Sequence, residues 1–383
     1  MAETRYELRI YNQAGTLKFL LTDFLRLEYS KVVNAPGLAV FDVIGTHPIV
    51  GNMARDWQVE VWRSRAADTG ESNAIAAYID FGGLIRDEIR ATDENGQTIC
   101  TYYAVGYIHL LQRSIVAYAA DVSNRTKFIN TAAETIAKTL VTRNATLSGT
   151  TVDKRDRDVP AWGGYISVQT DGGLGEPLDV FCPRRNLLTT LQDIATVGFG
   201  DFDLIKTAAR AWQFRWYADQ RGTDRSASVV FALQYGNMAR PQLRRRWIEE
   251  ATVAIVAGQG TEGNRAIVVR TGINYNERVN SLEILVDARD VSTTAGLNAR
   301  GDTYLDDLAA KDELTFSIIQ TPASLYGLHY FLGDIVKGYY QGVTSNKKIS
   351  GVTIRLDADG NETIDIALNN IPGVGAAIED PEE

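Results

Sequence analysis

The chain has few of the residues that most often carry chemistry in enzymes and metalloproteins. Its 383 residues include only two cysteines and three histidines. Cys100 and Cys182 lie far apart, so no disulfide framework can be read from them. His47, His109 and His329 each lack a second His, Cys or carboxylate at ligand spacing. We therefore expect no metal site and no cofactor.

Long hydrophobic runs and an excess of basic charge are also absent. The longest apolar stretches, such as residues 251–257, are far too short to span a bilayer, so we expect no dedicated membrane segment. The first residues, MAETRYELRI, have neither the basic nor the apolar region of an export signal. A net charge of −9 argues against a nucleic-acid coat protein. Acidic walls would still suit a channel for passing DNA, because they repel phosphates.

The composition that is present favours a folded, β-rich protein. Apolar residues make up 45% and charged residues 23%, as in ordinary globular domains. A chain of this length is expected to form more than one compact unit. Residues 5–118 and 250–368 read as strands, whereas residues 119–249 mix helical and strand patterns. The predicted class is α+β, predominantly β.

Within the two strand-rich regions, Gly and Asn residues separate the predicted strands. The Asp-Glu-Asn-Gly sequence at 93–96 predicts a tight hairpin turn. A helix is expected at 302–311, and the last residues, 373–383, form an acidic tail. The predicted strands are 6–11, 24–29, 37–44, 56–63, 76–90, 98–105, 252–257, 266–271, 280–287, 314–319, 334–340, 348–356 and 363–368.

The middle region begins with a helical pattern at 124–140 and continues into a polar stretch, 142–176. A second helix is predicted after Asn186, which can cap it, and should end at Gly198. We place Asp201 and Asp203 in a glycine-rich bend before a strand at 212–217. The run 229–233 is expected to pair back on that strand as a hairpin.

The order of a helix, a Gly-Asp bend, a tryptophan strand, a G-T-D-R-S turn and a V-V-F strand ending in G-N-M resembles the hub proteins of long-tailed bacteriophage tails. The segments 6–12, 258–260 and 332–336 also look like that family. The resemblance is to the siphophage tail hub family, which is related to the N-terminal hub module of tail-associated lysins and to contractile-tail baseplate hubs.

This resemblance implies two hub-type β-barrel domains that flank a mixed α/β middle domain. The corresponding divisions are 1–118 for the first barrel, 119–249 for the middle domain, 250–372 for the second barrel and 373–383 for the tail. Three chains with two barrels each would give a ring of six similar barrels, so that a threefold hub matches a sixfold tube.

The function implied by the resemblance is structural and not enzymatic. The chain is expected to form a homotrimer that ends the tail tube, anchors the spike or receptor-binding protein and lets DNA pass. Further expected partners are a distal tail or tail-tube protein and the tape-measure protein. The protein would be made in the host cytoplasm and would reside in the virion, at the distal end of the tail.

Two charged segments are the predicted partner contacts. The first is the basic cluster with an adjacent aromatic residue, which consists of Arg240, Arg244, Arg245, Arg246 and Trp247. Such a cluster can contact nucleic acid, although a salt-linked subunit interface or a solvated linker is the commoner role in an acidic protein. The second is the charge run at 153–158, represented by Asp153 and Arg155.

Two other functions compete with the hub interpretation. A carbohydrate-binding or glycoside-hydrolysing protein would use the aromatic strand at 212–217 together with Asp201 and Asp203. A nucleotide-binding enzyme would use the glycines at 258–263, which fit G-x-G-x-x-G. That motif leads into a strand-like run at 266–270 and not into a helix, so it favours a hairpin turn.

Overall fold

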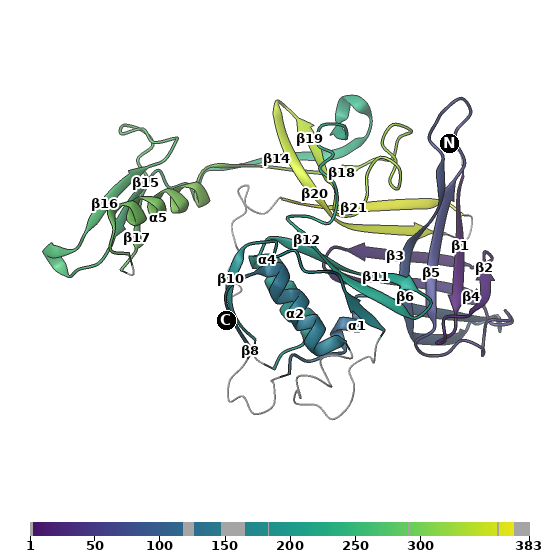
Figure 1. Cartoon of the computed structure of the whole chain (residues 1–383). Coiled ribbons are helices and arrows are strands. Elements are labelled where there is room, and N and C mark those ends of the chain that lie inside the picture. Colours follow the sequence, from purple (N-terminus) through teal and green to yellow (C-terminus); the bar gives the residue numbers. More distant parts are fainter. Residues whose placement is uncertain are drawn as a thin grey trace. The chain divides into compact units, whose positions relative to one another are not determined.

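The structure is a computed structural model that describes residues 3–117, 126–146, 165–182, 184–289, 291–357 and 360–370. It divides into two compact units. Unit 1 comprises Met1–Val229, Gln320–Val336 and Ile349–Leu368, and unit 2 comprises Val230–Ile319, Lys337–Lys348 and Asn369–Glu383. Strands predominate over helices in the described residues (Figure 1). The predicted predominantly β class is confirmed.

The large sheet of unit 1 joins the two ends of the chain. From β20 onward its strand order is β20-β3-β4-β7-β6-β5-β1-β2, with β21 also paired to β20. Strand β20 is antiparallel to β3, with Gly351 opposite Val32. The strands are β1 Thr4–Tyr11, β2 Leu17–Leu21, β3 Arg26–Val32, β4 Ala35–Ile44, β5 Gln58–Arg65, β6 Ile75–Thr92, β7 Thr98–Gly106, β20 Val343–Leu356 and β21 Glu362–Asn370.

Sequence periodicity located most of this sheet. The predicted strands at the N-terminus correspond to β1, β3, β4, β5, β6 and β7, and only β2 was missed. The hairpin predicted at 93–96 is confirmed, because β6 and β7 pair with Thr92 opposite Thr98. Gly96 has φ +79°, which a glycine adopts without the steric cost of a side chain.

The mixed α/β part of unit 1 has two layers. Helices α2 and α4 pack against a three-stranded sheet of order β11-β12-β9, and β8 pairs with β10 (Figure 1). The buried cluster includes Leu140, Leu191, Phe202 and Phe214. The elements are α1 His109–Gln112, β8 Thr126–Ala132, α2 Ala133–Ala145, β9 Ile166–Val168, β10 Pro177–Cys182, α4 Leu187–Val197, β11 Gly200–Ala208 and β12 Ala211–Ala218.

The first predicted helix began too early. Residues 126–132 form β8, and α2 begins only at Ala133. The apolar residues Phe128 and Ile129 fit a helical period, but the backbone of this segment instead pairs with β10. The pairing with β10 made this segment a strand, and a local sequence pattern does not reveal such a partner.

The second predicted helix is confirmed. Asn186 caps α4, because its side-chain oxygen accepts hydrogen bonds from the amides of Leu188 (3.0 Å) and Thr189 (3.4 Å). The next two predictions were wrong. Asp201 and Asp203 lie within β11 and not in a bend, and β12 forms its hairpin with β11 and not with residues 229–233.

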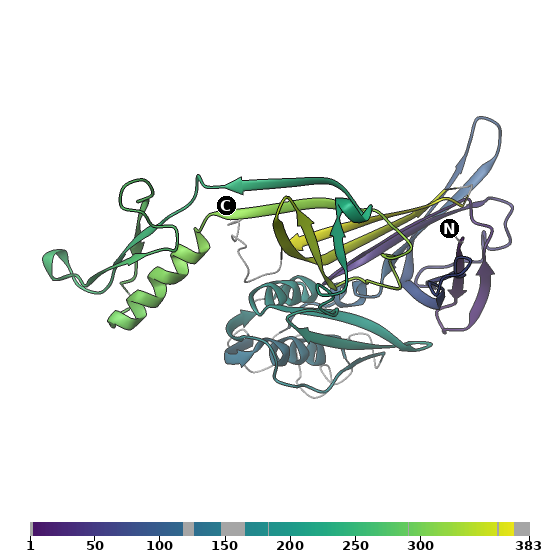
Figure 2. The ribbon, with the colours of Figure 1, turned by 90° about the horizontal axis from the view of Figure 1, so that it is seen from above.

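Unit 2 consists of a two-stranded ribbon and a small α/β module. The ribbon pairs β14 with β18, and the module has a sheet of order β16-β15-β17 with α5 packed on it (Figure 2). A short strand, β13 Val230–Ala232, runs parallel to β19 Ile335–Tyr340. The other elements are η1 Leu233–Tyr235, β14 Met238–Arg246, β15 Val253–Ala257, η2 Glu262–Asn264, β16 Ile267–Thr271, β17 Glu283–Asp287, α5 Thr294–Asp307 and β18 Lys311–Ile318.

The glycine motif at 258–263 is a hairpin connection, as predicted. It joins β15 to the antiparallel strand β16, with Val253 opposite Thr271. Gly260 has φ +113°, a conformation that side-chain-bearing residues rarely adopt. The helix expected at 302–311 instead spans Thr294–Asp307, where Thr293 accepts a 3.2 Å hydrogen bond from the Gly296 amide as its N-cap.

The barrel architecture is not confirmed. Among the strands in the described ranges, no pairing joins the ends of a sheet into a closed barrel. The expected divisions at residues 118, 249 and 372 stay a prediction.

Candidate functional site

The predicted basic contact residues lie on one strand of the unit 2 ribbon. Arg240, Arg244 and Arg245 are exposed on β14, Arg246 is half-buried, and Trp247 directly follows the strand with 62% of its side chain exposed. Arg246 donates to Glu249 at 2.9 Å. The arginines lie on a strand with a register irregularity at Arg240, which has φ +48°, and not in a linker.

Asp153 and Arg155, the other two predicted contacts, lie outside the described residues. The prediction that they contact a partner therefore stays a prediction.

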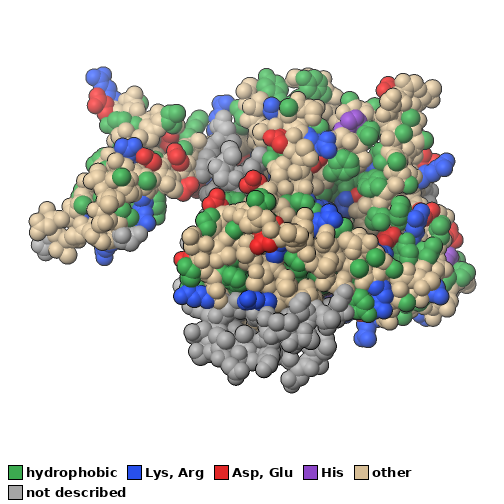
Figure 3. Space-filling model, in the orientation of Figure 1, with side chains coloured by type: hydrophobic (Ala, Val, Ile, Leu, Met, Phe, Trp, Pro, Cys, Tyr) green, Lys and Arg blue, Asp and Glu red, His purple; other side chains and the backbone are tan. Residues whose placement is uncertain are grey.

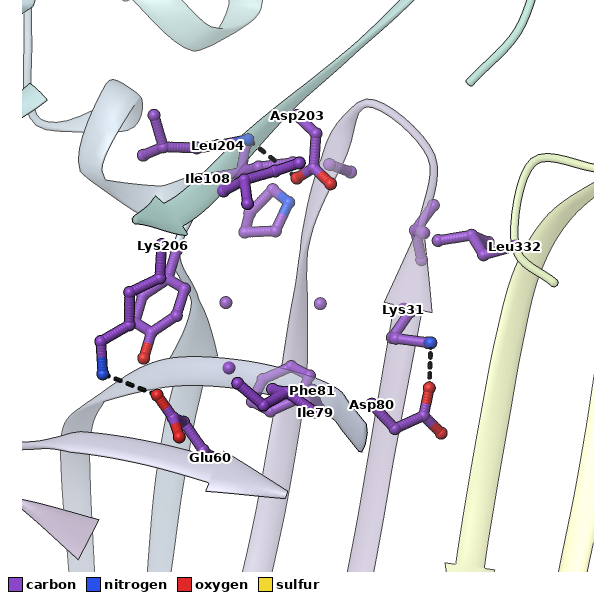
Figure 4. A pocket seen from close by; sticks show the side chains of 18 of the residues that line it. Lys31, Glu60, Ile79, Asp80, Phe81, Ile108, Asp203, Leu204, Lys206 and Leu332 are labelled. Carbon is purple, nitrogen blue, oxygen red and sulfur yellow. Dashed lines mark hydrogen bonds and ion pairs between the residues drawn. The ribbon is translucent and has the colours of Figure 1, made fainter. Parts of the chain in front are cut away.

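Unit 1 contains a cavity of about 260 Å³. It lies between the large sheet and β11, and ion pairs stand on opposite walls (Figure 4). Lys206 on β11 is 2.6 Å from Glu60 on β5, and Lys31 on β3 is paired with Asp80 on β6. A third pair joins Arg221 to Asp203 at 2.5 Å. The labelled side chains of Ile79, Phe81, Ile108 and Leu332 add apolar surface.

One polar group in this cavity wall lacks a partner. The hydroxyl of Tyr107 is buried, and it neither donates nor accepts a hydrogen bond among the described residues. Burial, followed by the nearby Glu60 carboxylate, raises the pKa of Tyr107 well above its usual value. The rings of Tyr107 and Trp212 pack with their centroids 5.5 Å apart, and this contact holds the Tyr107 ring in place.

Asp80 is the centre of a buried polar cluster. Its carboxylate accepts hydrogen bonds from the hydroxyls of Tyr29 (2.6 Å) and Tyr326 (2.9 Å) and pairs with Lys31. Burial alone would raise the pKa of Asp80, but Lys31, Tyr29 and Arg63 outweigh it, so this pKa is lower than usual. The charge is thus held ionised inside the protein.

Arg63 extends the cluster to segments that are distant in sequence. Its guanidinium donates to the Tyr326 carbonyl at 3.0 Å, to the Glu362 carboxylate at 3.0 Å and to the Tyr6 hydroxyl at 2.9 Å. These bonds tie residues 320–336 and β21 to the N-terminal strands of unit 1. Every charge in the cluster has a partner. Its role is therefore structural, because it holds these segments together.

Sequence reasoning did not find these residues. Arg63 and Asp80 are buried on strands, at positions where alternation directs the side chain inward. A charged residue at such a position is the sequence signal that could have marked them. Their partners were not predictable, since Tyr326 and Glu362 come from the other end of the chain.

The residues of the carbohydrate interpretation do not form a groove. Trp212 and Trp216 are each only 4% exposed and belong to the core of unit 1. Asp201 is buried and accepts a 2.7 Å hydrogen bond from the Arg221 amide, while Asp203 pairs with the Arg221 side chain. Neither carboxylate faces an aromatic binding surface.

The histidines have ordinary surroundings. His109 Nδ1 lies 3.0 Å from the Gln112 amide oxygen, and burial lowers its pKa. His329 accepts a hydrogen bond from the Leu325 amide at 2.9 Å. Within the described ranges, no three His, Cys, Asp or Glu side chains come together as metal ligands. The helices that the structure describes include none with the length and apolar character needed to cross a membrane.

Solved structures of tail proteins share this fold. The 43 kDa tail protein of prophage MuSo2 from Shewanella oneidensis is 13% identical, with a TM-score of 0.53 over 97% of this chain and 100% of that one. Prophage tail protein gp18 from Listeria monocytogenes is 13% identical, with a TM-score of 0.52 over 96% of each chain. A Francisella PdpA-VgrG complex matches at 9% identity and TM-score 0.52, over 100% of this chain and 60% of that chain.

This chain shares its fold with prophage tail proteins, and together with the family match that follows this makes it a structural protein of the phage tail and baseplate class. A search of curated protein sequences finds no match. The family model described as Siphovirus ReqiPepy6 Gp37-like protein matches residues 7–368, and the chain belongs to that family. This membership implies a place in the virion.

Proposed function

We propose that this protein is the tail-tip hub of a long-tailed phage and acts as a homotrimeric ring. The ring ends the tail tube, anchors the spike or receptor-binding protein and lets DNA pass during ejection. The observation that carries the proposal is the family match over residues 7–368, which covers the strand-rich halves as well as the middle of the chain. The fold shared end to end with prophage tail proteins supports it.

The neighbours of the hub in this proposal are a distal tail or tail-tube protein on one side and the spike or receptor-binding protein on the other. The tape-measure protein ends at the same place. The complex between PdpA and VgrG in Francisella supports the idea that this fold works within a larger assembly. Synthesis in the host cytoplasm precedes assembly.

The proposed role is not enzymatic. Glu60, Asp80 and Asp203, the carboxylates that line the cavity, are each paired with a cation, which disfavours their use as a general acid or a nucleophile. Purified protein should leave peptidoglycan turbidity unchanged under conditions in which a control lysozyme clears it. Clearance by this chain would contradict the non-enzymatic role.

The pair of hub-type barrels belongs to the same proposal. The open sheet edges of each chain would be closed by neighbouring chains, because unpaired edges otherwise invite aggregation. A map of the assembled ring at a resolution that separates strands should contain six barrel-like sections around one axis.

Labelling of assembled virions tests the proposal directly. An antibody against this chain, coupled to gold, should mark the distal end of the tail in electron micrographs. A label spread along the tube or located on the head would overturn the hub role. Light scattering of the purified ring should give about three times 42.2 kDa.

A further inference from the structure

The sheet of the unit 2 module has one covered and one uncovered face. Alternate residues of β15, including Ala254 and Val256, point to the side where α5 packs with Leu297 and Leu305. The residues between them point to the opposite side. Among the described elements outside the sheet, α5 is the one that packs closely on it. On the opposite side, Val253 and Ala257 of the central strand are buried, whereas the residues of the outer strands β16 and β17 are exposed.

The uncovered face carries a continuous apolar stripe. Ile255 on the central strand lies opposite Val269 on one neighbour and Leu285 on the other. Val269 is 57% exposed and Leu285 is 72% exposed, and Ile267 beside them is 52% exposed. Soluble monomers rarely leave such a stripe in water, so this face is built to be covered.

Acidic residues border this stripe on β17. Glu283 and Asp287 lie two residues on either side of Leu285, and strand alternation places all three on the uncovered face. Asp287 already pairs with Arg265 at 2.6 Å. Glu283 is exposed and has no ion pair with any described residue. Figure 3, in the orientation of Figure 1, shows the opposite side of this module, the side that carries α5, at the left of the view.

The ribbon of the same unit offers the complementary chemistry. Arg240 and Arg244 are exposed on β14. Glu313 of β18 lies opposite Arg244 in the strand register, but the two side chains form no ion pair in the described part of the chain. Exposed apolar residues follow at once, because Trp247 is 62% and Ile248 is 92% exposed. A basic strand with an apolar end thus matches an apolar face with an acidic border.

We infer that the uncovered face of the β16-β15-β17 sheet binds the β14 arginine strand of a second copy of this chain, with Glu283 of one copy pairing with Arg244 of the next. Because the two surfaces differ, the contact is heterologous, and its repetition forms a ring where the rotation between copies closes and an open filament where it does not. The inference rests on the proposed function only in that the chain assembles with itself.

A reciprocal charge exchange tests the contact. Glu283→Arg and Arg244→Glu should each raise the dissociation constant for self-association at least about tenfold, since each places like charges against each other. The double variant restores the pair and should recover most of the affinity. Sedimentation velocity over a range of protein concentrations, at low and moderate salt, measures all four proteins.

Two further variants separate the contact from general effects. Leu285→Ser removes apolar area from the stripe and should also weaken association. Asp306→Arg changes an exposed charge on α5, outside the uncovered sheet face, and should leave association unchanged. Circular dichroism spectra that match the wild type confirm that each variant is folded.

Several results would overturn the inference. The first is a wild-type chain that stays monomeric at every concentration, and the second is a double variant that recovers no affinity. The third is self-association that is unchanged by both Glu283→Arg and Leu285→Ser. If Leu285→Ser instead abolished binding to another tail protein, that protein and not a second copy would be the occupant. The gold-labelling experiment on virions does not depend on any of these results, so it tests the hub proposal separately.

Discussion

At the scale of single residues, Asp80 shows how a charge can serve a structural role. Its carboxylate is buried and is held by Lys31 and by two tyrosine hydroxyls. A buried ion pair is not by itself stabilising, because taking charges out of water is costly. Removing one partner is costly as well, since the remaining charge stays buried without compensation. The stability of the fold therefore depends on the contact between residues 80 and 326.

We expect Asp80→Asn to destabilise unit 1 by about 3–5 kcal/mol, the usual effect of breaking a buried ion pair. Denaturant unfolding followed by tryptophan fluorescence measures this change. Glu88→Gln is the matched control on the same strand, because Glu88 forms a more exposed pair with Arg90. Its unfolding midpoint should stay at the wild-type value. Equal midpoints for Asp80→Asn and wild type would show that the cluster adds nothing.

The stability of unit 1 should fall as the solution becomes acidic. The pKa values of Asp80 and Asp56 are lower in the folded protein than is usual for aspartate, although burial acts in the opposite direction on both. A carboxyl with a depressed folded pKa adds stability above its unfolded pKa, about 3.9, and loses it as pH falls through the folded value.

Unfolding curves between pH 7 and pH 3 test this dependence. Stability should be flat above about pH 5 and should drop below about pH 4, and the drop should be shallower in Asp80→Asn. The same slope in both proteins would exclude Asp80 as a source of the acid sensitivity.

At the scale of elements, the predictions that succeeded depend on local signals. The cap at Asn186, the alternation of Trp212, Phe214 and Trp216 and the turn at Gly96 each act within a few residues. The predictions that failed concern partners. The apolar period at 124–140 fits a helix and a strand alike at its beginning, and only pairing with β10 decides. Residues 229–233 are strand-like, but their partner is β19.

The N-cap of α4 gives an element-scale prediction. Asn186→Ala should destabilise the protein by about 1 kcal/mol, because two amides of the first turn lose their acceptor. The Asn186 side chain also donates to the Gln112 carbonyl at 2.6 Å. Asn186→Asp keeps the acceptor and loses that donor, so it should cost less. Thr189→Ala, at an exposed position of the same turn, serves as the control in thermal unfolding.

At the scale of the whole molecule, the two units have separate buried cores. Unit 1 has the cluster around Leu191 and Phe214, whereas the unit 2 module has a smaller cluster around Leu297. A small core supplies less stabilisation than a large one. We expect the module to unfold at a lower denaturant concentration than the α/β part of unit 1.

Core truncations test this independence. Leu297→Ala should lower only the first transition and Leu191→Ala only the second, each by about 2–5 kcal/mol, because both side chains are fully buried. Hydrogen exchange with peptide-level readout assigns each transition to its segment. A single transition shifted equally by both variants would contradict two independent cores.

The sequence by itself determined the strand-rich character, the capped helix, the tight turns and the resemblance to tail hubs, because these depend on neighbours within a few residues or on the order of motifs. Tertiary structure alone decided that β20 and β21 join the N-terminal sheet, that Arg63 meets Glu362 and that one face of the module sheet stays uncovered. The physical reason is that such contacts depend on which distant strands pair, and a local pattern carries no information about its partner.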